Sequence, residues 1–166
     1  MLRPILSCCA FLLLLACADT DATSETSAPT PPPATTTAVP NKPNLPSVPL
    51  DTLRMLYNES NYIDYLFFEL PVSMSQNTQA DVQGALSYIS AETPVRPAGC
   101  QPIGQIFYEV RGNTRLRANL YFSPGCVYLE FLDGEQPKYA NKLMPGGIEF
   151  FNNLLRQLGK PTVPTN

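Results

Sequence analysis

Between Cys100 and Cys126, hydrophobic and polar residues alternate, which is typical of β-strands with one buried and one solvent-exposed face. The apolar positions fall on one face of two successive segments: Ile106, Tyr108, Val110, Leu116, Ala118, Leu120 and Phe122. Gly112 and Asn113 separate the segments, and both residue types favour tight turns. The pattern therefore predicts a β-hairpin whose apolar face packs against the core.

The length of the connecting loop decides which residues of the hairpin face each other. A two-residue turn at Gly112-Asn113 would put Glu109 on the same face as Leu116, and a slip of one residue turns every side chain to the other face. A three-residue loop, 112–114, places Val110 opposite Leu116 and keeps the apolar face continuous. We therefore predict the three-residue loop.

Apolar residues at helical spacing predict helices on both sides of the hairpin. A short helix follows Asp51, and a second one is capped by Thr78 with Asp81. A last helix occupies 148–158, and Gly159 fits its C-cap. The apolar stripes of these three helices are Leu53, Leu56 and Tyr57; Val82, Ala85, Leu86 and Ile89; and Ile148, Phe151, Leu154, Leu155 and Leu158.

Residues 61–70 fit two kinds of secondary structure. Helical spacing is present, and Pro71 would end the helix. The positions at that spacing are Ile63, Leu66, Phe67 and Leu70. Because Tyr65 and Phe68 make the other side apolar too, the segment is buried on most faces, and a buried strand is the alternative. We predict a helix and leave the strand open.

After the hairpin, the turn Pro124-Gly125 leads directly into a third strand that carries Val127, Leu129 and Phe131 on its core side. A turn at Asp133-Gly134 then precedes a fourth, edge strand over 138–143. The sequence therefore predicts an α+β fold of two layers. One layer is an antiparallel meander of three to four strands, and the other holds the N-terminal helices and a C-terminal helix.

Proline divides the chain of 166 residues into regions. Of its 18 prolines, eight fall between Thr20 and Pro49, in a segment otherwise rich in Ser, Thr, Ala and acids. Such a segment buries too little apolar surface to fold, so we predict a disordered linker over 17–49. Residues 50–160 then form a single globular domain, and 161–166 form a flexible tail.

Two cysteines of the predicted domain flank the hairpin. The register of the three-residue loop, counted outward, brings Cys100 opposite Cys126. Pro102 and Pro124 interrupt the ladder before that point, so the pairing is approximate. We predict a disulfide that clamps the open end of the hairpin, stabilising the domain by roughly 3–4 kcal/mol on the loop-closure model.

The first 16 residues have the features of a secretory signal peptide. Arg3 gives a short positive region, and Leu12–Leu15 belong to an apolar core too short to cross a membrane. The segment Leu14-Leu15-Ala16-Cys17 resembles the lipobox of bacterial lipoproteins. This resemblance implies that the signal is cut before Cys17 and that this cysteine carries the lipid anchor. Ala18, in place of an aspartate after the cysteine, is compatible with sorting to the outer membrane of Gram-negative bacteria.

Arginines cluster near the tip of the hairpin and form a candidate binding patch. The patch comprises Arg111, Arg115, Arg117 and Tyr121. It could hold an acidic glycan, a phosphate or an acidic protein surface. The alternative is a solvated strand face in which Glu109, opposite Arg117 in the predicted register, neutralises that arginine.

Composition argues against several chemical functions. The chain has no histidine, which removes His-based triads and His metal ligands, and it has no ligand cluster for a metal. We therefore predict no metal and no cofactor. A net charge of −3 does not suggest nucleic-acid binding. Glu109 and Glu130 could in principle support a carboxylate-dependent hydrolase, but both fall on strand positions predicted to be exposed.

The sequence thus favours a lipid-anchored cell-envelope protein whose domain is a non-catalytic binding module. Its expected contacts are the membrane, through the anchor at Cys17, and an envelope protein or a glycan. The order of helices and strands is similar to that of small lipoproteins of outer-membrane protein assembly, which makes an assembly accessory one alternative. The hydrolase is the other. The sequence leaves open whether the domain faces the periplasm or the cell surface.

Overall fold

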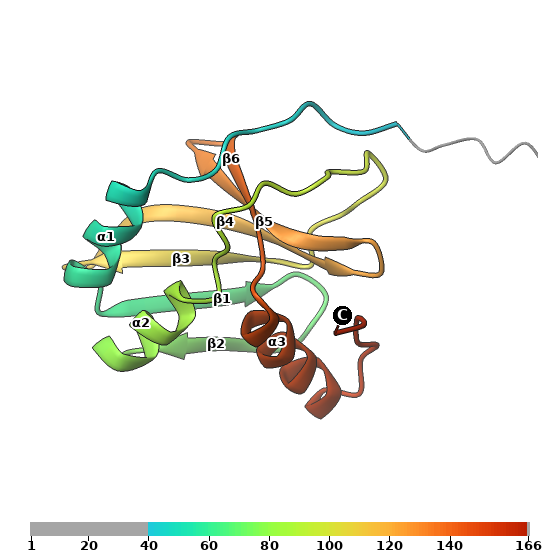
Figure 1. Cartoon of the computed structure of the whole chain (residues 1–166). Coiled ribbons are helices and arrows are strands. Elements are labelled where there is room, and N and C mark those ends of the chain that lie inside the picture. The colour runs from blue at the N-terminus through green and yellow to red at the C-terminus, as the bar shows by residue number, and fades with distance from the viewer. Residues whose placement is uncertain (1–39, 166) are drawn as a thin grey trace, which may run out of the picture. The chain divides into compact units, whose positions relative to one another are not determined.

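The computed structural model describes residues 40–165. The predicted signal peptide, Cys17 and most of the predicted linker lie outside these residues. The described part is an α+β fold with a six-stranded sheet and three helices (Figure 1). The strands are β1 (Tyr62–Phe67), β2 (Ser73–Gln76), β3 (Gly104–Val110), β4 (Asn113–Ser123), β5 (Cys126–Asp133) and β6 (Gln136–Lys142). The helices are α1 (Leu50–Glu59), α2 (Gln79–Leu86) and α3 (Pro145–Gln157).

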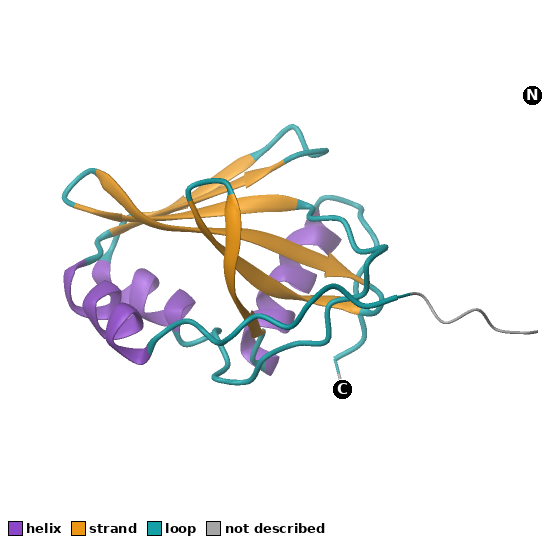
Figure 2. Cartoon of the chain, turned by 90° about the horizontal axis from the view of Figure 1, so that it is seen from above, coloured by secondary structure: helices purple, strands orange, loops and turns teal. Residues whose placement is uncertain are grey.

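The strands lie in the order β2-β1-β3-β4-β5-β6, and every neighbouring pair is antiparallel. The three helices lie on the same side of the sheet (Figure 2). One core cluster joins Leu56 of α1, Val82 of α2 and Phe151 of α3 to the apolar side chains of the sheet. The α+β class and the two layers are confirmed, but the prediction of three to four strands is wrong, because two further strands form at the β2 edge.

Strand β1 replaces the helix predicted over 61–70. Ile63, Tyr65 and Phe67 are buried, while Leu66 between them is 45% exposed. The apolar positions therefore follow the two-residue period of a strand, and the strand alternative is the correct one. Apolar residues on both sides of the segment fit either period, and the unpaired edge of β3 decides between them by providing a ladder of hydrogen bonds.

The β3–β4 hairpin has a shorter loop than predicted. Val110 faces Asn113 across a two-residue turn at Arg111-Gly112, whose φ angles of 53° and 73° are both positive. An irregularity follows at once, because Glu109 faces Thr114 while Tyr108 faces Leu116, which leaves Arg115 as an extra residue.

This bulge returns the apolar residues of β4 to the core side. Tyr108 and Leu116 face each other and are both buried, as are Ile106 and Ala118. The predicted burial of this face is therefore confirmed. The predicted pairing of Val110 with Leu116 is wrong, because Leu116 faces Tyr108, two residues earlier in β3.

The elements after the hairpin agree with the sequence pattern. Leu129 and Phe131 of β5 are buried in the core, and β6 is an edge strand. The chain covers this edge itself, because Ala140 N donates to Pro46 O (2.9 Å) and Lys142 N donates to Glu92 O (2.8 Å). The edge is thereby protected from pairing with another chain. Helix α2 begins at its predicted cap, where Thr78 Oγ1 accepts from Asp81 N (3.2 Å).

Contacts of the domain extend beyond the expected boundaries at both ends. Residues 40–48, which we call the strap, run along the domain as extended chain. Val48 of the strap is buried, and its N donates to Asn141 Oδ1 (2.9 Å). At the other end, Val163 is buried within residues expected to form a flexible tail. The domain's contacts therefore reach at least from Pro40 to Val163.

Candidate functional site

The four residues of the candidate arginine patch lie in different environments, although Arg115 and Arg117 line the same shallow hollow. Arg111 and Arg115 are exposed at the tip of the hairpin. Arg117 is already engaged, since its guanidinium donates to Glu135 Oε1 (2.7 Å) and to Gly134 O. Tyr121 is 3% exposed and lies stacked on Tyr128, with ring centroids 4.3 Å apart. The predicted neutralisation of Arg117 by Glu109 is wrong, because Arg117 faces Phe107 across the β3–β4 pair.

Glu130, predicted to be exposed, is 2% exposed and forms an ion pair with Arg96. Arg96 is equally buried, and its second terminal nitrogen donates to Pro43 O of the strap (2.6 Å). The strap, through Pro43, and the 93–101 loop, through Arg96, lie over this part of the sheet, which is why Glu130 is buried there. No local pattern marks this pair, since its partners are 34 residues apart and Arg96 lies in an irregular loop.

Tyr121 and Tyr128 join Arg96 and Glu130 in one buried polar cluster. The Tyr121 hydroxyl donates to Glu130 Oε1 (3.2 Å). Lys42 Nζ, in the strap, lies 5.1 Å from the centroid of the Tyr121 ring. Burial, and to a smaller degree the charge of Glu130, raise the pKa of Tyr128 to about 12. The Tyr128 hydroxyl and Arg96 Nε have no hydrogen-bond partner among residues 40–165. Because the cluster is closed to solvent, we assign it a structural role.

The hydrolase alternative requires two carboxylates that converge on one point. Glu130 is aligned across the sheet with Asn119 and Gln105, whereas Glu109 lies four positions further along β3. The two carboxylates thus stand on different strands, with β4 between them, and the Glu130 carboxylate is occupied by Arg96. They do not form a common site.

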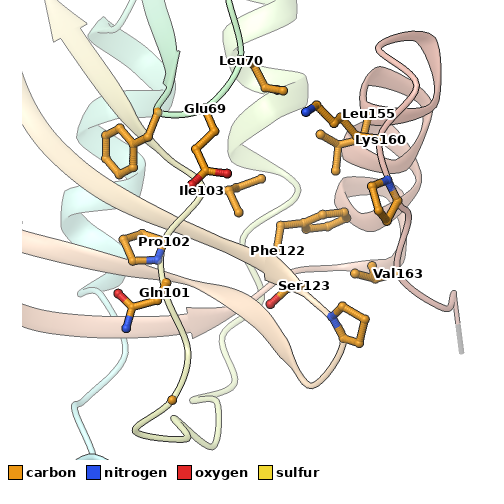
Figure 3. Close-up of a pocket in the computed structure, with 14 residues that line it drawn as sticks. Glu69, Leu70, Gln101, Pro102, Ile103, Phe122, Ser123, Leu155, Lys160 and Val163 are labelled. Carbon is orange, nitrogen blue, oxygen red and sulfur yellow. The ribbon is translucent and has the colours of Figure 1, made fainter.

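A pocket of about 750 Å³ opens at one end of the sheet, beside the C-terminal end of α3 (Figure 3). Its lining residues are Phe68, Glu69, Leu70, Gly99, Gln101, Pro102, Ile103, Phe122, Ser123, Pro124, Leu155, Lys160, Pro161 and Val163. We call it the end pocket. Its volume lies within the range typical of small-molecule sites, and most of its lining is apolar. Sequence reasoning missed it because its residues come from four separate segments of the chain.

The disulfide holds one wall of the end pocket. Cys100 and Cys126 are bonded, with Cα atoms 5.7 Å apart, which confirms the predicted bridge. Gly99 and Gln101 flank Cys100, and Pro124 lies two residues before Cys126, so the bridge joins two lining segments. The register that suggested the bridge was nevertheless two residues off, since the observed pairing of Gly104 with Leu120 would align Cys100 with Pro124.

The chain after α3 forms the opposite wall. Gly159, with a φ of 66°, reverses the chain, and Lys160 N then donates to Leu155 O (2.9 Å). The Asn152 side chain holds the next turn, because its Nδ2 donates to Val163 O (2.8 Å) and its Oδ1 accepts from Val163 N (2.9 Å). Both walls are therefore fixed by the protein itself, and the pocket is formed without a ligand.

Phe68 and Ile103 form the rim between the walls, next to a tight contact between β1 and β3. A side chain on Gly104 would place its Cβ 2.4 Å from Leu66 O, so only glycine permits this approach. Just outside it, Phe68 N donates to Ile103 O (3.0 Å). Phe68 itself remains 50% exposed. The rim thus carries an exposed aromatic side chain on a rigid backbone.

No protein-family model, curated protein sequence or solved structure matches this chain. Within residues 40–165, no group of three or more acidic or cysteine side chains is placed to hold a metal ion. In the same part of the chain, no helix has both the length and the apolar character that a membrane span requires.

Proposed function

We propose that this chain is a lipid-anchored protein of the bacterial cell envelope whose domain is a non-catalytic binding module. The anchor is Cys17, and the segment Leu14-Leu15-Ala16-Cys17 supports it. The binding site is the end pocket, which takes the apolar part of a ligand. This proposal differs from the protein or glycan partner that the sequence suggested, because the lining of the pocket is mostly apolar.

The observation that carries the binding function is the apolar lining of a pocket with fixed walls. Phe122, Leu155 and Val163 belong to the hydrophobic core, yet they also line the pocket. These three are almost fully buried, so the apolar surface that a ligand would remove from water lies on Phe68, which is 50% exposed, and on the partly buried Leu70 and Ile103. Removing that surface from water favours binding by roughly 25 cal/mol per Å² before the costs of association. Glu69 is the one carboxylate of the lining, which supports binding rather than hydrolysis.

A neutral fluorescent dye, N-phenylnaphthylamine, tests the pocket. The assay uses the full chain carrying Cys17→Ser, since this substitution removes the acyl chains that would compete for the dye. We expect dye fluorescence to rise on binding and Phe68→Ser to weaken binding roughly tenfold, because half of a Phe side chain contributes about 1–1.5 kcal/mol. Ser123→Trp should also weaken it by filling the pocket.

Val95→Ser is the matched control for the dye experiment. Val95 is 66% exposed and does not line the pocket, so its replacement removes surface apolar area elsewhere. Dye binding that responds equally to Val95→Ser and Phe68→Ser, or to neither, would place the dye outside the pocket and contradict the proposal.

The anchor has a separate test. Two or more acyl chains on Cys17 would bind membranes stably, whereas a single chain binds only marginally. Cys17→Ser should therefore move the protein from the membrane fraction to the soluble fraction of the envelope. Sedimentation of this variant with membranes after a high-salt wash would show that Cys17 does not carry the anchor.

A further inference from the structure

The end pocket carries one positive and one negative side chain on its lining, and neither is paired. Lys160 comes from the α3 side and Glu69 from the β1 side, as Figure 3 shows. Neither forms an ion pair with a residue of the described chain, 40–165, although five other ion pairs are present there. Both charges are therefore available to a ligand.

Hydrogen bonds hold the backbone at or next to each charged residue, while both residues are exposed. Lys160 follows the chain reversal at Gly159 and is held by its hydrogen bond to Leu155 O. Glu69 follows Phe68, whose N donates to Ile103 O. A ligand that filled the pocket would thus meet a cation from one side and an anion from the other.

From this arrangement we propose that the end pocket binds a single-chain amphiphile with a zwitterionic head. The hydrocarbon chain lies against Phe122, Leu155 and Val163, the anionic group of the head faces Lys160, and the cationic group faces Glu69. This inference rests on the proposed binding function of the pocket and specifies its ligand.

A zwitterion with an apolar body could also be a short peptide, and the floor of the pocket distinguishes the two. Gln101 and Ser123 are the only uncharged lining residues with hydrogen-bonding side chains, and the floor side chains Phe122, Leu155 and Val163 have none. A peptide would leave backbone amides unpaired against them, and a buried amide without a partner is costly. A hydrocarbon chain has no polar group to satisfy, so the structure favours the lipid-like ligand.

The test measures displacement of N-phenylnaphthylamine from the full chain carrying Cys17→Ser. The competitors are three amphiphiles with the same dodecyl chain, each used below its micelle concentration. Dodecylphosphocholine is zwitterionic, dodecyl phosphate is anionic and dodecyltrimethylammonium is cationic. We expect dodecylphosphocholine to displace the dye at the lowest concentration, and trileucine, a zwitterionic peptide, to displace it least.

Two substitutions that each remove one charge then show which group of the amphiphile head Lys160 and Glu69 bind. Lys160→Gln should weaken the binding of dodecylphosphocholine and dodecyl phosphate about threefold and leave the binding of the cationic amphiphile unchanged. Glu69→Gln should weaken the binding of dodecylphosphocholine and of the cationic amphiphile by a similar factor and leave the binding of the anionic one unchanged. Lys138→Gln is the control, because Lys138 is an exposed lysine of β6 that does not line the pocket.

The outcomes separate this inference from the function on which it rests. Equal displacement by the three amphiphiles, unchanged by either substitution, would overturn the zwitterionic ligand while leaving the apolar pocket intact. Tightest binding of a singly charged amphiphile, or of trileucine, would also overturn it. Failure of the dye itself to bind would contradict the proposed function.

Discussion

At the residue scale, the buried Arg96–Glu130 pair is the least expected feature. Taking both charges out of water costs several kcal/mol per ion, and only close pairing with further hydrogen bonds offsets this cost. Further hydrogen bonds are present, because Arg96 also donates to Pro43 O and Glu130 also accepts from Tyr121, and Arg96 Nε alone of the pair lacks a partner among residues 40–165. The pair thus joins the strap, the 93–101 loop and strand β5.

Removal of one member of this pair should be strongly destabilising. Arg96→Met or Glu130→Gln should lower the free energy of unfolding by about 3–5 kcal/mol, because each leaves the partner buried without its counterpart. The double variant Arg96→Met, Glu130→Leu should lose less than the sum of the two. Urea denaturation, followed by circular dichroism, measures the change.

The exposed pair Lys142–Glu92 supplies the control for that series. Its nitrogen–oxygen distance is 2.7 Å, but both side chains are about half exposed or more. The hydrogen bond from Lys142, and then its charge, lower the pKa of Glu92. Glu92→Gln should leave the urea midpoint nearly unchanged. A loss for Glu130→Gln no larger than this would show that the buried pair is solvated.

At the element scale, the β3–β4 hairpin combines a two-residue turn with a bulge. Arg111 is the one described non-glycine residue with a positive φ, and the left-handed region costs such a residue about 1–2 kcal/mol. Sequence-based register prediction failed here because arginine is not typical of that turn position, where asparagine followed by glycine is common. The extra residue, Arg115, then restores the burial that the pattern had predicted.

Replacement of Arg111 by asparagine should therefore stabilise the domain. We expect Arg111→Asn to raise the free energy of unfolding by about 1 kcal/mol, since asparagine tolerates the left-handed region better. Arg115→Asn removes the same charge four residues further on, where φ is not positive. A gain shared equally by both variants would assign the effect to charge rather than to backbone conformation.

At the scale of the whole molecule, the end pocket depends on segments far apart in the chain. The disulfide fixes one wall, and the two hydrogen bonds between Asn152 and Val163 fix the other. Residues expected to be flexible, 161–166, thus contribute Pro161 and Val163 to the lining. The affinity of the pocket should therefore depend on groups that never touch the ligand.

Asn152→Ala should weaken binding of N-phenylnaphthylamine about fivefold, because a loosened tail must be ordered again at a cost of about 1 kcal/mol. Asn153→Ala is the control, since the neighbouring Asn153 is exposed and accepts only from Arg156 (3.0 Å). Unchanged dye affinity in Asn152→Ala would show that the tail does not form the binding wall.

Short-range patterns in the sequence were sufficient to predict several buried faces and helix ends of this protein. The period of the apolar residues set the buried faces of β3, β4 and β5 and of the last helix. Thr78 and Gly159 marked the two helix ends where the structure has them. Each of these signals acts within a few residues, so no distant partner was needed to interpret it.

The tertiary structure decided what depends on distant partners. Residues 62–67 became a strand because β3 offered an unpaired edge, and Glu130 became buried because Arg96 and the strap cover it. The end pocket likewise exists only where four segments converge. A local period states which face of a segment avoids water, but the surface that meets that face is supplied by the rest of the chain.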